Sequence, residues 1–459
     1  MVSLSSSSTT DRPLASVLFV TLGCAKNEVD TDRMRALLLR AGFAEAEDVD
    51  VADVAVVNTC SFLASATEES IEATLELAED AEEGVRGLPI VMCGCVPSRY
   101  GDDLPGELPE VTAFVKADEE DAIVDVVRGV LGIDGSSETG AADGILRTIT
   151  GASAFVKISE GCNRFCAFCA IPFIRGRYRS RLASDIISEV ASLMEGGVRE
   201  VVLIGQDTGV WGSDLPGAGT LATLLRQVAE VVRPYGGWVR VLYLQPEGMT
   251  DELITTIRDT PEVLDYIDIP IQHCSERVLE RMGRSGSVDQ LRELFARLRR
   301  EIPGMVLRTT ALVGFPGETD EEVDELVDFI QEEEFDYCSV FPYSQEEGTA
   351  AAEMPDQIPE DVKLERTQRL VDLTEELGFA ATARHLGERA RVIIDGVEES
   401  DDGVELIGHA WFQAPDSDGA VHIMSGEASV GDIVTCDLVD SFCYEMIGEL
   451  VATEGEERS

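Results

Sequence analysis

Three cysteines stand close together at Cys162, Cys166 and Cys169, and a polar Asn-Arg pair lies within the first interval. Three thiolates can hold three irons of a cubane 4Fe–4S cluster, which leaves the fourth iron open to a substrate or cofactor. The C-x3-C-x2-C spacing differs from both ferredoxin spacings. No fourth ligand follows at short range, as a zinc site would require. The alternative interpretation is that the three thiols only fill a core.

A second set of cysteines, Cys24, Cys60 and Cys95, has intervals of ~35 residues, the length of one βα repeat. Each cysteine directly follows a short β-branched run that predicts a strand. Because the carboxyl ends of parallel strands lie along one edge of a sheet, the three thiols can converge there. The alternative is that each thiol is an ordinary buried side chain. We interpret the other cysteines as structural: Cys93, Cys274, Cys338, Cys436 and Cys443.

The elements that would position the second set lie between residues 15 and 133. Short apolar runs alternate there with helical patterns, which is typical of a parallel α/β sheet. The predicted strands are residues 16–21, 51–57, 89–93 and 111–115, and the predicted helices are residues 27–41, 64–82 and 119–131. We expect a Rossmann-like N-terminal domain over residues 15–133.

The βα alternation resumes after residue 148, and the C-x3-C-x2-C run follows the first strand of this part. Six strands suit an incomplete (βα)6 TIM-type barrel, predicted over residues 148–383, better than a full eight-stranded barrel. They are residues 154–158, 200–204, 239–244, 266–269, 305–312 and 337–343. A long helix over 359–385 precedes short β runs that predict a small antiparallel β-barrel over residues 384–452. These runs are residues 390–394, 404–410, 420–423 and 433–440.

Three remaining segments are small and polar, and we expect a disordered leader at 1–14, a linker at 134–147 and a polar tail at 453–459. No apolar run approaches the ~18 residues that span a bilayer. The leader lacks the apolar centre of an export signal. Eleven cysteines without such a signal indicate a reducing compartment. The sequence therefore predicts a cytoplasmic protein with no membrane partner.

The balance of charge is strongly acidic, with 36 Lys and Arg against 88 Asp and Glu and a net charge of −52. Such a chain repels nucleic acid at long range and attracts a basic partner. Only four of the cations are lysine, and the rest are arginine. A GC-rich genome and adaptation to a salty cytoplasm would give the same bias, so charge alone leaves both explanations open.

Several motifs together resemble the radical S-adenosylmethionine methylthiotransferases, and the resemblance covers nearly the whole chain. Its most specific part is the run around Cys162, Cys166 and Cys169. The other segments that carry it are Thr21–Asp30, Asn58–Cys60 and Val313–Thr319, together with a late β-barrel that is similar to the TRAM domain of that family. This family has one branch that modifies tRNA adenosine and another that modifies an aspartate of a small-subunit ribosomal protein.

The chain is more similar to the ribosomal-protein branch. The segments that favour it are Cys24–Asn27, Ile171–Arg181, Leu203–Thr208, Asp268–His273, Phe341–Thr349 and Ala414–Gly419. Charge provides a separate argument, because a TRAM domain that serves RNA should be basic. Between Leu386 and Leu450 there are fifteen Asp and Glu against two arginines. The acidic domain favours a basic ribosomal protein as partner and makes tRNA the alternative substrate.

The resemblance implies that Cys162, Cys166 and Cys169 hold the cluster that binds S-adenosylmethionine, whose cleavage yields a 5′-deoxyadenosyl radical. That radical would take hydrogen from the β-carbon of the substrate aspartate, a carbon that no side-chain base can deprotonate. It also implies that Cys24, Cys60 and Cys95 hold an auxiliary 4Fe–4S cluster, where sulfur is methylated before transfer. A reductant protein is a further implied partner. Apart from the cluster ligands, no catalytic residue is predicted.

Several other residues are weaker candidates for a role in binding or catalysis. Phe168 would pack on adenine or simply fill the core, and Gln206 and Asp207 end the second barrel strand, where barrels place ligand contacts. The alternate arginines Arg175, Arg177, Arg179 and Arg181 could face a carboxylate such as the substrate aspartate, although surface ion pairs in an acid-rich protein explain them better. His273 is expected to be a core histidine, and the glycines of the Val313–Thr319 run a turn at a strand end.

Other classes fit less well. A pure iron–sulfur electron carrier would have four ligands per cluster and no large barrel. A binding module of the translation apparatus that has lost catalysis would not keep both sets of cysteines.

Overall fold

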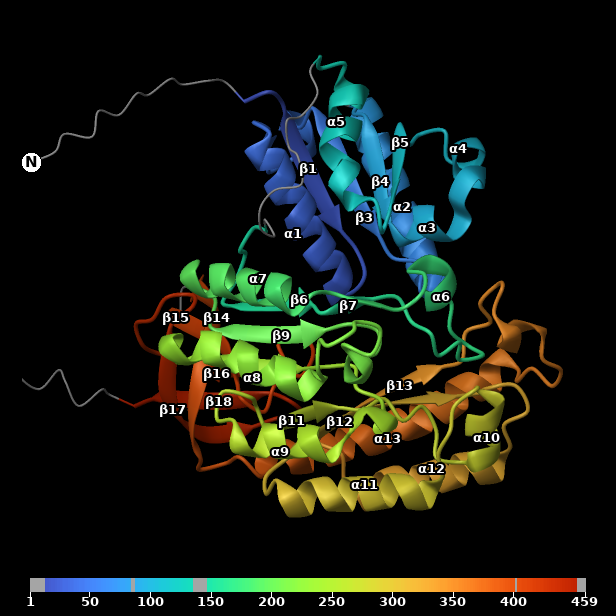
Figure 1. The fold of residues 1–459 in the computed structure, drawn as a ribbon, viewed down its shortest axis with the longest axis vertical. Helices are drawn as coiled ribbons and strands as arrows, with labels where there is room; N and C mark the ends of the chain where they lie inside the picture. The colour runs from blue at the N-terminus through green and yellow to red at the C-terminus, as the bar shows by residue number, and fades with distance from the viewer. Residues whose placement is uncertain (1–12, 84–86, 135–146, 401–402, 452–459) are drawn as a thin grey trace, which may run out of the picture. The chain divides into compact units, whose positions relative to one another are not determined.

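A computed structural model describes residues 13–83, 87–134, 147–400 and 403–451. The chain forms two compact units. The first comprises the chain up to Thr148 together with Phe173–Arg175, and the second comprises Ile149–Pro172 and everything from Gly176 onward (Figure 1). Most of the predicted leader, linker and tail lie outside the described residues. Within the described part of the chain, no helix is long and apolar enough to cross a membrane.

A five-stranded parallel sheet in the order β2-β1-β3-β4-β5 organises the first unit. Its strands are β1 (Ser16–Thr21), β2 (Ala44–Glu45), β3 (Val54–Thr59), β4 (Ile90–Gly94) and β5 (Ala113–Lys116). The strands β3 and β4 are buried along their whole length. A sheet covered on both faces requires such continuous apolar runs, which is why the sequence pattern identified these two strands.

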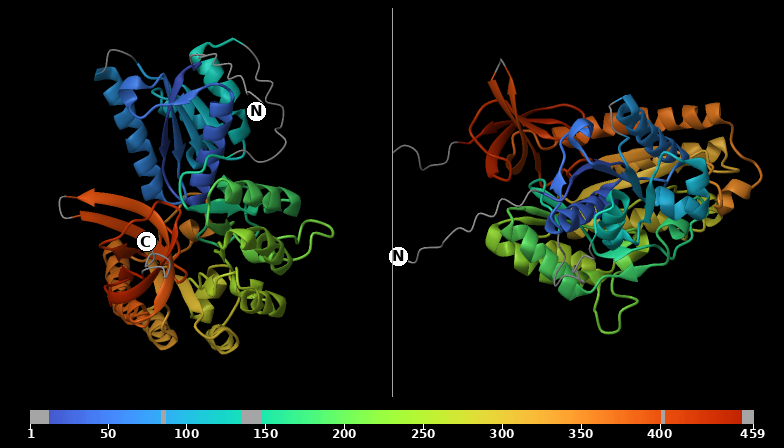
Figure 2. Two further views of the ribbon diagram at one scale, coloured as in Figure 1. Left: turned by 90° about the vertical axis from the view of Figure 1, so that its left-hand side faces the viewer. Right: turned by 90° about the horizontal axis from the view of Figure 1, so that it is seen from above.

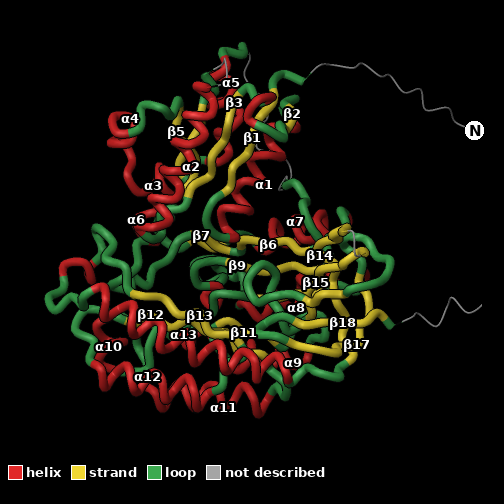
Figure 3. Tube along the Cα trace, turned by 180° about the vertical axis from the view of Figure 1, so that it is seen from behind, coloured by secondary structure: helices red, strands yellow, loops and turns green. Residues whose placement is uncertain are grey.

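Helices cover both faces of this sheet (Figure 3). They are α1 (Ala25–Arg40), α2 (Ala64–Glu83), α3 (Cys95–Tyr100), α4 (Leu104–Glu107) and α5 (Ile123–Leu131). Apolar residues of α1 and α5 pack on one face of the sheet. Those of α2 and α4 pack on the other face. The three longest helices agree with the predicted ones, whereas the short helix α3 contains Pro97 and was not predicted.

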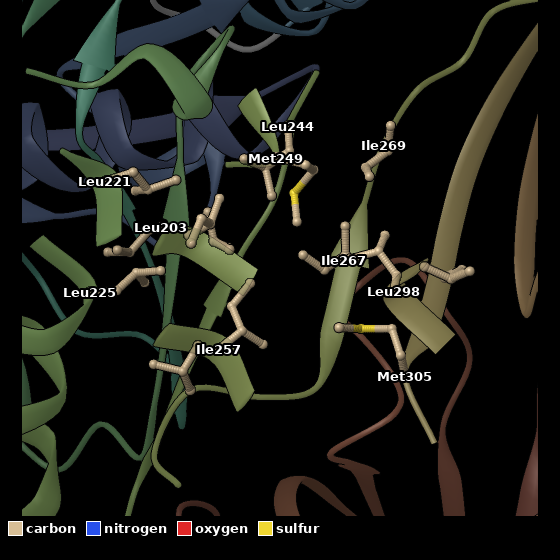
Figure 4. Packing of buried hydrophobic residues seen from close by; sticks show 14 of the residues in the cluster. Leu203, Leu221, Leu225, Leu244, Met249, Ile257, Ile267, Ile269, Leu298 and Met305 are labelled. Atoms are coloured by element: carbon tan, nitrogen blue, oxygen red, sulfur yellow. The ribbon is translucent and has the colours of Figure 1, made fainter. Parts of the chain in front are cut away.

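Six parallel strands form the first part of the second unit, as expected for an incomplete barrel. They make two three-stranded sheets, β10-β9-β6 and β11-β12-β13. Their bounds are β6 (Ser153–Lys157), β9 (Glu200–Ile204), β10 (Trp238–Val241), β11 (Tyr266–Asp268), β12 (Val306–Val313) and β13 (Tyr337–Pro342). One core serves both sheets, because Leu203 of β9 and Ile267 of β11 belong to the same apolar cluster (Figure 4).

Helices follow the barrel strands, as the alternating pattern predicted. They are α6 (Ile171–Ile174), α7 (Ala183–Glu195), α8 (Leu221–Val232), α9 (Asp251–Asp259), α10 (Glu276–Arg281), α11 (Val288–Glu301), α12 (Asp320–Glu333) and α13 (Glu360–Ala383). A two-stranded antiparallel ladder, β7 (Ser159–Glu160) with β8 (Arg179–Ser180), brackets the cysteine-rich loop. The ladder pairs the residues just before Cys162 with residues that follow α6.

A closed five-stranded barrel in the order β14-β15-β16-β18-β17 ends the chain (Figure 2). Its strands are β14 (Arg389–Ser400), β15 (Gly403–Ala410), β16 (Val421–Ile423), β17 (Ile433–Ser441) and β18 (Met446–Leu450). The antiparallel expectation holds for every pair except β16 and β18, which are parallel. The sequence pattern did not predict β18, the strand whose pairing with β16 and β17 closes the barrel.

A buried ionic network connects β9 and β10 with this small barrel. Arg240 Nε donates to Glu200 Oε1 at 2.6 Å, and its other edge donates to the carbonyl oxygen of Gln413 at 2.8 Å. His409 lies between two carboxylates, with Nε2 2.5 Å from Glu200 Oε2 and Nδ1 2.5 Å from Asp395 Oδ2. Burial alone would lower the pKa of His409, but the two carboxylates outweigh it and raise that pKa to about 9. The imidazolium is therefore charged at neutral pH.

The raised pKa of His409 makes stability depend on pH. Its folded-state value lies above the ordinary value of 6.5, so its contribution is complete below pH 6.5 and is lost as pH rises through about 9. We expect the free energy of unfolding to fall over this interval by up to ~3 kcal/mol. Urea denaturation at a series of pH values would measure it. The variant His409→Gln should lack this component, and an identical pH dependence in both proteins would contradict the assignment.

Candidate metal and cofactor sites

The first unit places Cys24, Cys60 and Cys95 at one edge of its sheet. Cys24 lies between β1 and α1, Cys60 directly follows β3, and Cys95 directly follows β4. These strands are neighbours in parallel register, so their carboxyl ends coincide. Burial, with smaller contributions from the charges of Cys95 and Cys24, raises the pKa of Cys60 to about 11. The three thiols thus lie within electrostatic range of one another.

Buried amide groups tie the loops of these cysteines together. Asn27, in the first turn of α1, donates to Asn58 Oδ1 at 3.2 Å and to the carbonyl oxygen of Thr59 at 2.9 Å. Asn58 donates in return to the carbonyl oxygen of Asn27 at 2.8 Å. Thr59 Oγ1 donates to the carbonyl oxygen of Cys93 and accepts from the amide of Val96. These side chains hold the three loops in register, and the sequence analysis had not assigned them a role.

A glycine precedes two of the cysteines where no larger residue fits. Gly23 has a φ of +104°, and a Cβ added there would lie 2.6 Å from Cys60 Cβ. Gly94 has a φ of +92°, and its Cβ would lie 2.3 Å from Asn58 Oδ1. Both positions combine a left-handed backbone with close approach to a neighbouring loop. The glycines therefore allow the cysteine loops to pack against each other.

Arg175 belongs to this first unit and is buried within it. Its guanidinium donates to Asp30 Oδ2 at 2.8 Å and to Cys95 Sγ at 3.4 Å. Burial raises the pKa of Cys95, and the charge and hydrogen bond of Arg175 oppose that rise. The alternate arginines that follow make separate contacts. Arg177 stacks on the Phe165 ring at 4.2 Å, and Arg181 pairs with Glu189 at 2.7 Å.

In the second unit, the loop after β7 carries Cys162, Cys166 and Cys169. The amide of Cys169 donates to the carbonyl oxygen of Cys166 at 3.0 Å, and the amide of Arg164 donates to Cys162 Sγ at 3.5 Å. Burial raises the pKa of Cys169 to about 12, with smaller upward contributions from the two other thiolates. A metal must displace the protons of these buried thiols in order to bind them.

Charged side chains lie beside this loop. Arg164 Nε donates to Asp207 Oδ2 at 2.5 Å, and its NH1 group lies 3.2 Å from Glu247 Oε2. Gln206 donates to Glu160 Oε1 at 2.8 Å. Among the described residues, Gln206 Oε1 and Asp207 Oδ1 are buried acceptors without a hydrogen-bond partner. Such groups are costly unless a ligand satisfies them, so this strand end is suited to binding a polar molecule.

The half-buried Arg284 adds a second cation near Cys166, and loss of solvation is the main cause that lowers its pKa. The thiolate of Cys166 opposes that effect, which places the guanidinium within electrostatic range of the sulfur. Its NH2 group donates to the carbonyl oxygen of Pro270 at 3.0 Å and to Gln245 Oε1. Neither Arg164 nor Arg284 was predicted. The Asn-Arg pair inside the cysteine motif was the only sequence signal for the first of them.

The weaker candidates have different surroundings. Phe168 packs against an apolar cluster that contains Met282 and Phe315, so it fills a core at least in part. His273 is fully buried, and burial lowers its pKa to about 4. Its Nδ1 accepts from the amide of Ser275 at 2.9 Å, so it is a neutral core histidine. In the turn after β12, the carboxylate of Glu318 accepts a hydrogen bond from the amide of Gly314 at 2.8 Å. A phosphate loop would use such an amide to hold its ligand.

The donor chemistry of both cysteine sets is that of iron–sulfur clusters. Soft thiolates are the usual ligands of such clusters. Over residues 13–83, 87–134, 147–400 and 403–451, no group of three His, Cys, Asp or Glu side chains is set closely enough to share a single metal ion. Two sets of three free cysteines nevertheless provide the thiol ligands that a cubane cluster uses.

Comparisons with known proteins agree with this architecture. Three family profiles match successive parts of the chain: "Uncharacterized protein family UPF0004" at residues 16–116, "Radical SAM superfamily" at residues 156–330 and "TRAM domain" at residues 386–451. A radical S-adenosylmethionine methyltransferase, TsrM from Kitasatospora setae, shares the fold with a TM-score of 0.52 at 16% identity. The match covers 71% of this chain and 72% of that one.

Curated relatives match almost the whole chain. The "Ribosomal protein uS12 methylthiotransferase RimO" of Geobacter sulfurreducens is 42% identical over 95% of this chain and 98% of its own length. The protein of the same name from Natranaerobius thermophilus is 39% identical over 94% of this chain and 98% of its own length.

The fold and the C-x3-C-x2-C loop define a radical S-adenosylmethionine enzyme, which uses S-adenosylmethionine and a 4Fe–4S cluster. More particularly, the chain belongs to the RimO family of methylthiotransferases.

The close approach at Gly23 can be tested by substitution. In Gly23→Ala, the new Cβ would strain the backbone and clash with Cys60, so we expect the free energy of unfolding to fall by ~3 kcal/mol. Chemical denaturation of the cluster-free chain would measure the change. Gly132→Ala is the matched control, because Gly132 also has a positive φ, of +64°, but has open space around it. It should lose only ~1 kcal/mol, and equal losses would contradict the packing argument.

Proposed function

We propose that this enzyme attaches a methylthio group to the β-carbon of an aspartate in the small-subunit ribosomal protein uS12. The observation that carries the proposal is the near full-length similarity to relatives named for that activity. Two complete sets of three cysteines support it, because one radical cluster and one sulfur-carrying cluster are needed to make this bond. A cytoplasmic location, where thiols remain reduced, is part of the same proposal.

Each set of residues has a separate part in the proposed reaction. Cys162, Cys166 and Cys169 would hold the radical cluster, and the auxiliary cluster would be held by Cys24, Cys60 and Cys95. When bound, the clusters and S-adenosylmethionine supply the radical and the methylated sulfur.

The protein contributes binding and orientation. Gln206 and Asp207 would satisfy their buried oxygens on polar groups of S-adenosylmethionine. The partly buried ring of Phe168 would cover its adenine.

The charge of the C-terminal barrel supports a protein substrate. Its fifteen carboxylates and two arginines would attract a basic ribosomal protein and repel the phosphates of tRNA. One of these arginines, Arg389, is already paired with Asp437 at 2.7 Å. A tRNA adenosine methylthiotransferase stays the second candidate, because it would use the same two sets of cysteines. An electron-donating protein is the other proposed partner.

The substrate is the first point to test. Small-subunit ribosomal proteins and tRNA nucleosides would be compared by mass spectrometry between cells with and without the gene. We expect a methylthio mass gain on a single aspartate peptide of uS12 that depends on the gene. A change confined to a tRNA adenosine would leave the cluster chemistry intact and transfer the activity to the other substrate.

The division of labour between the clusters gives a second test. Cys162→Ala should abolish cleavage of S-adenosylmethionine to 5′-deoxyadenosine, because the radical cluster loses a ligand. Cys60→Ala should retain that cleavage but form no methylthiolated peptide. Both products can be followed by liquid chromatography and mass spectrometry on the reconstituted enzyme, with buried Cys274→Ala as the control for loss of a thiol elsewhere. Methylthiolation by Cys60→Ala would refute the proposed roles.

A further inference from the structure

Arg175 is unusual because it is a buried cation in contact with a proposed cluster ligand. Its side chain is 2% exposed, and that of its partner Asp30 is 3% exposed. Burying an ion pair is costly unless the pair makes well-directed hydrogen bonds. Here one terminal nitrogen, NH1, donates to Asp30 and the other, NH2, donates to Cys95 Sγ. The planar guanidinium is thus directed by a carboxylate on one side and points at a sulfur on the other.

We propose that Arg175 is a positioning residue that fixes Cys95 and raises the reduction potential of the auxiliary cluster. This inference rests on the proposed binding of that cluster by Cys24, Cys60 and Cys95. A hydrogen bond to a ligand sulfur withdraws negative charge from it, and a nearby buried cation favours the more negative, reduced cluster. Both effects act in the same direction.

The choice of arginine follows from the geometry. A guanidinium presents several N–H donors in a rigid fork, so it can bind a carboxylate and a sulfur at the same time in fixed directions. A lysine ammonium is a compact charge on a flexible chain. It would keep the positive charge but not the aligned pair of contacts. A glutamine would keep neither the charge nor the fork.

The reduction potential can be measured on the auxiliary cluster alone. The radical cluster is removed with the triple variant Cys162→Ala, Cys166→Ala and Cys169→Ala, and the remaining cluster is reconstituted in the full chain. Redox titration followed by electron paramagnetic resonance gives its potential, and iron and sulfide analysis gives its content. In this background we expect Arg175→Gln to shift the potential to a more negative value, and Arg175→Lys to shift it less.

A matched control separates the local effect from net charge. Arg33→Gln removes a cation from the same unit, but that side chain pairs at the surface with Asp121 at 2.5 Å, outside the cysteine loops. The auxiliary cluster of the Arg33→Gln variant should have the same reduction potential as that of the triple variant. An unchanged potential in both Arg175 variants, with full cluster content, would overturn the inference. If Arg175→Gln does not retain the cluster, the Arg175→Lys potential decides the matter.

The same experiment distinguishes failure of the proposed function. If the triple variant binds no cluster while Arg175 is intact, the auxiliary cluster itself is refuted, and the role of Arg175 with it. If the cluster binds and only the potential is insensitive, the proposed function stands and the inference falls.

Discussion

Parallel pairing of neighbouring strands is the constraint on which both cysteine sites depend. In the first unit it brings the carboxyl ends of β1, β3 and β4 to one edge, so that loops distant in sequence meet there. In the second unit the same rule places Gln206 and Asp207 just beyond β9, beside the cysteine-rich loop. The sheet determines where the loops lie, and the side chains of the loops are the chemical groups of the site. Hydrogen bonds of side-chain amides such as Asn27 and Asn58 then hold neighbouring cysteine loops together.

Strands with continuous apolar runs could be predicted from the sequence, because burial on both faces leaves few polar residues in them. The prediction gave β1 and β9 their observed bounds and placed most other strands within a few residues. It missed β2, β7 and β8, which have only two residues each, and β18, whose Gly448 and Glu449 interrupt the pattern. The parallel pairing of β16 with β18 depends on barrel closure, which no local pattern encodes.

Site residues could be predicted where their spacing along the sequence carries information. They could not be predicted where their role depends on which side chains are buried. The six cysteines follow strand ends or stand in a fixed motif, so their grouping could be inferred. Arg175 could not be separated from the arginines after it, because the sequence favoured surface ion pairs for all of them and does not show which one is buried. In the structure its neighbours make separate contacts, such as that of Arg177 with Phe165. The buried amides were present in the motifs that carried the family resemblance, but a motif alone does not say which side chains bind each other.

The ionic network around Glu200 and Arg240 couples the C-terminal barrel to the strands β9 and β10. Glu200 of β9 and Arg240 of β10 form one side of the network. His409 and the backbone of Gln413 form the other side. Without the small barrel, Glu200 would lose its contact with His409 and Arg240 would lose the carbonyl acceptor of Gln413, and unmatched buried polar groups are unfavourable. A C-terminal domain from a relative can therefore be grafted onto this chain only together with its complementary charges. The small barrel and the strands β9 and β10 thus share one buried polar network.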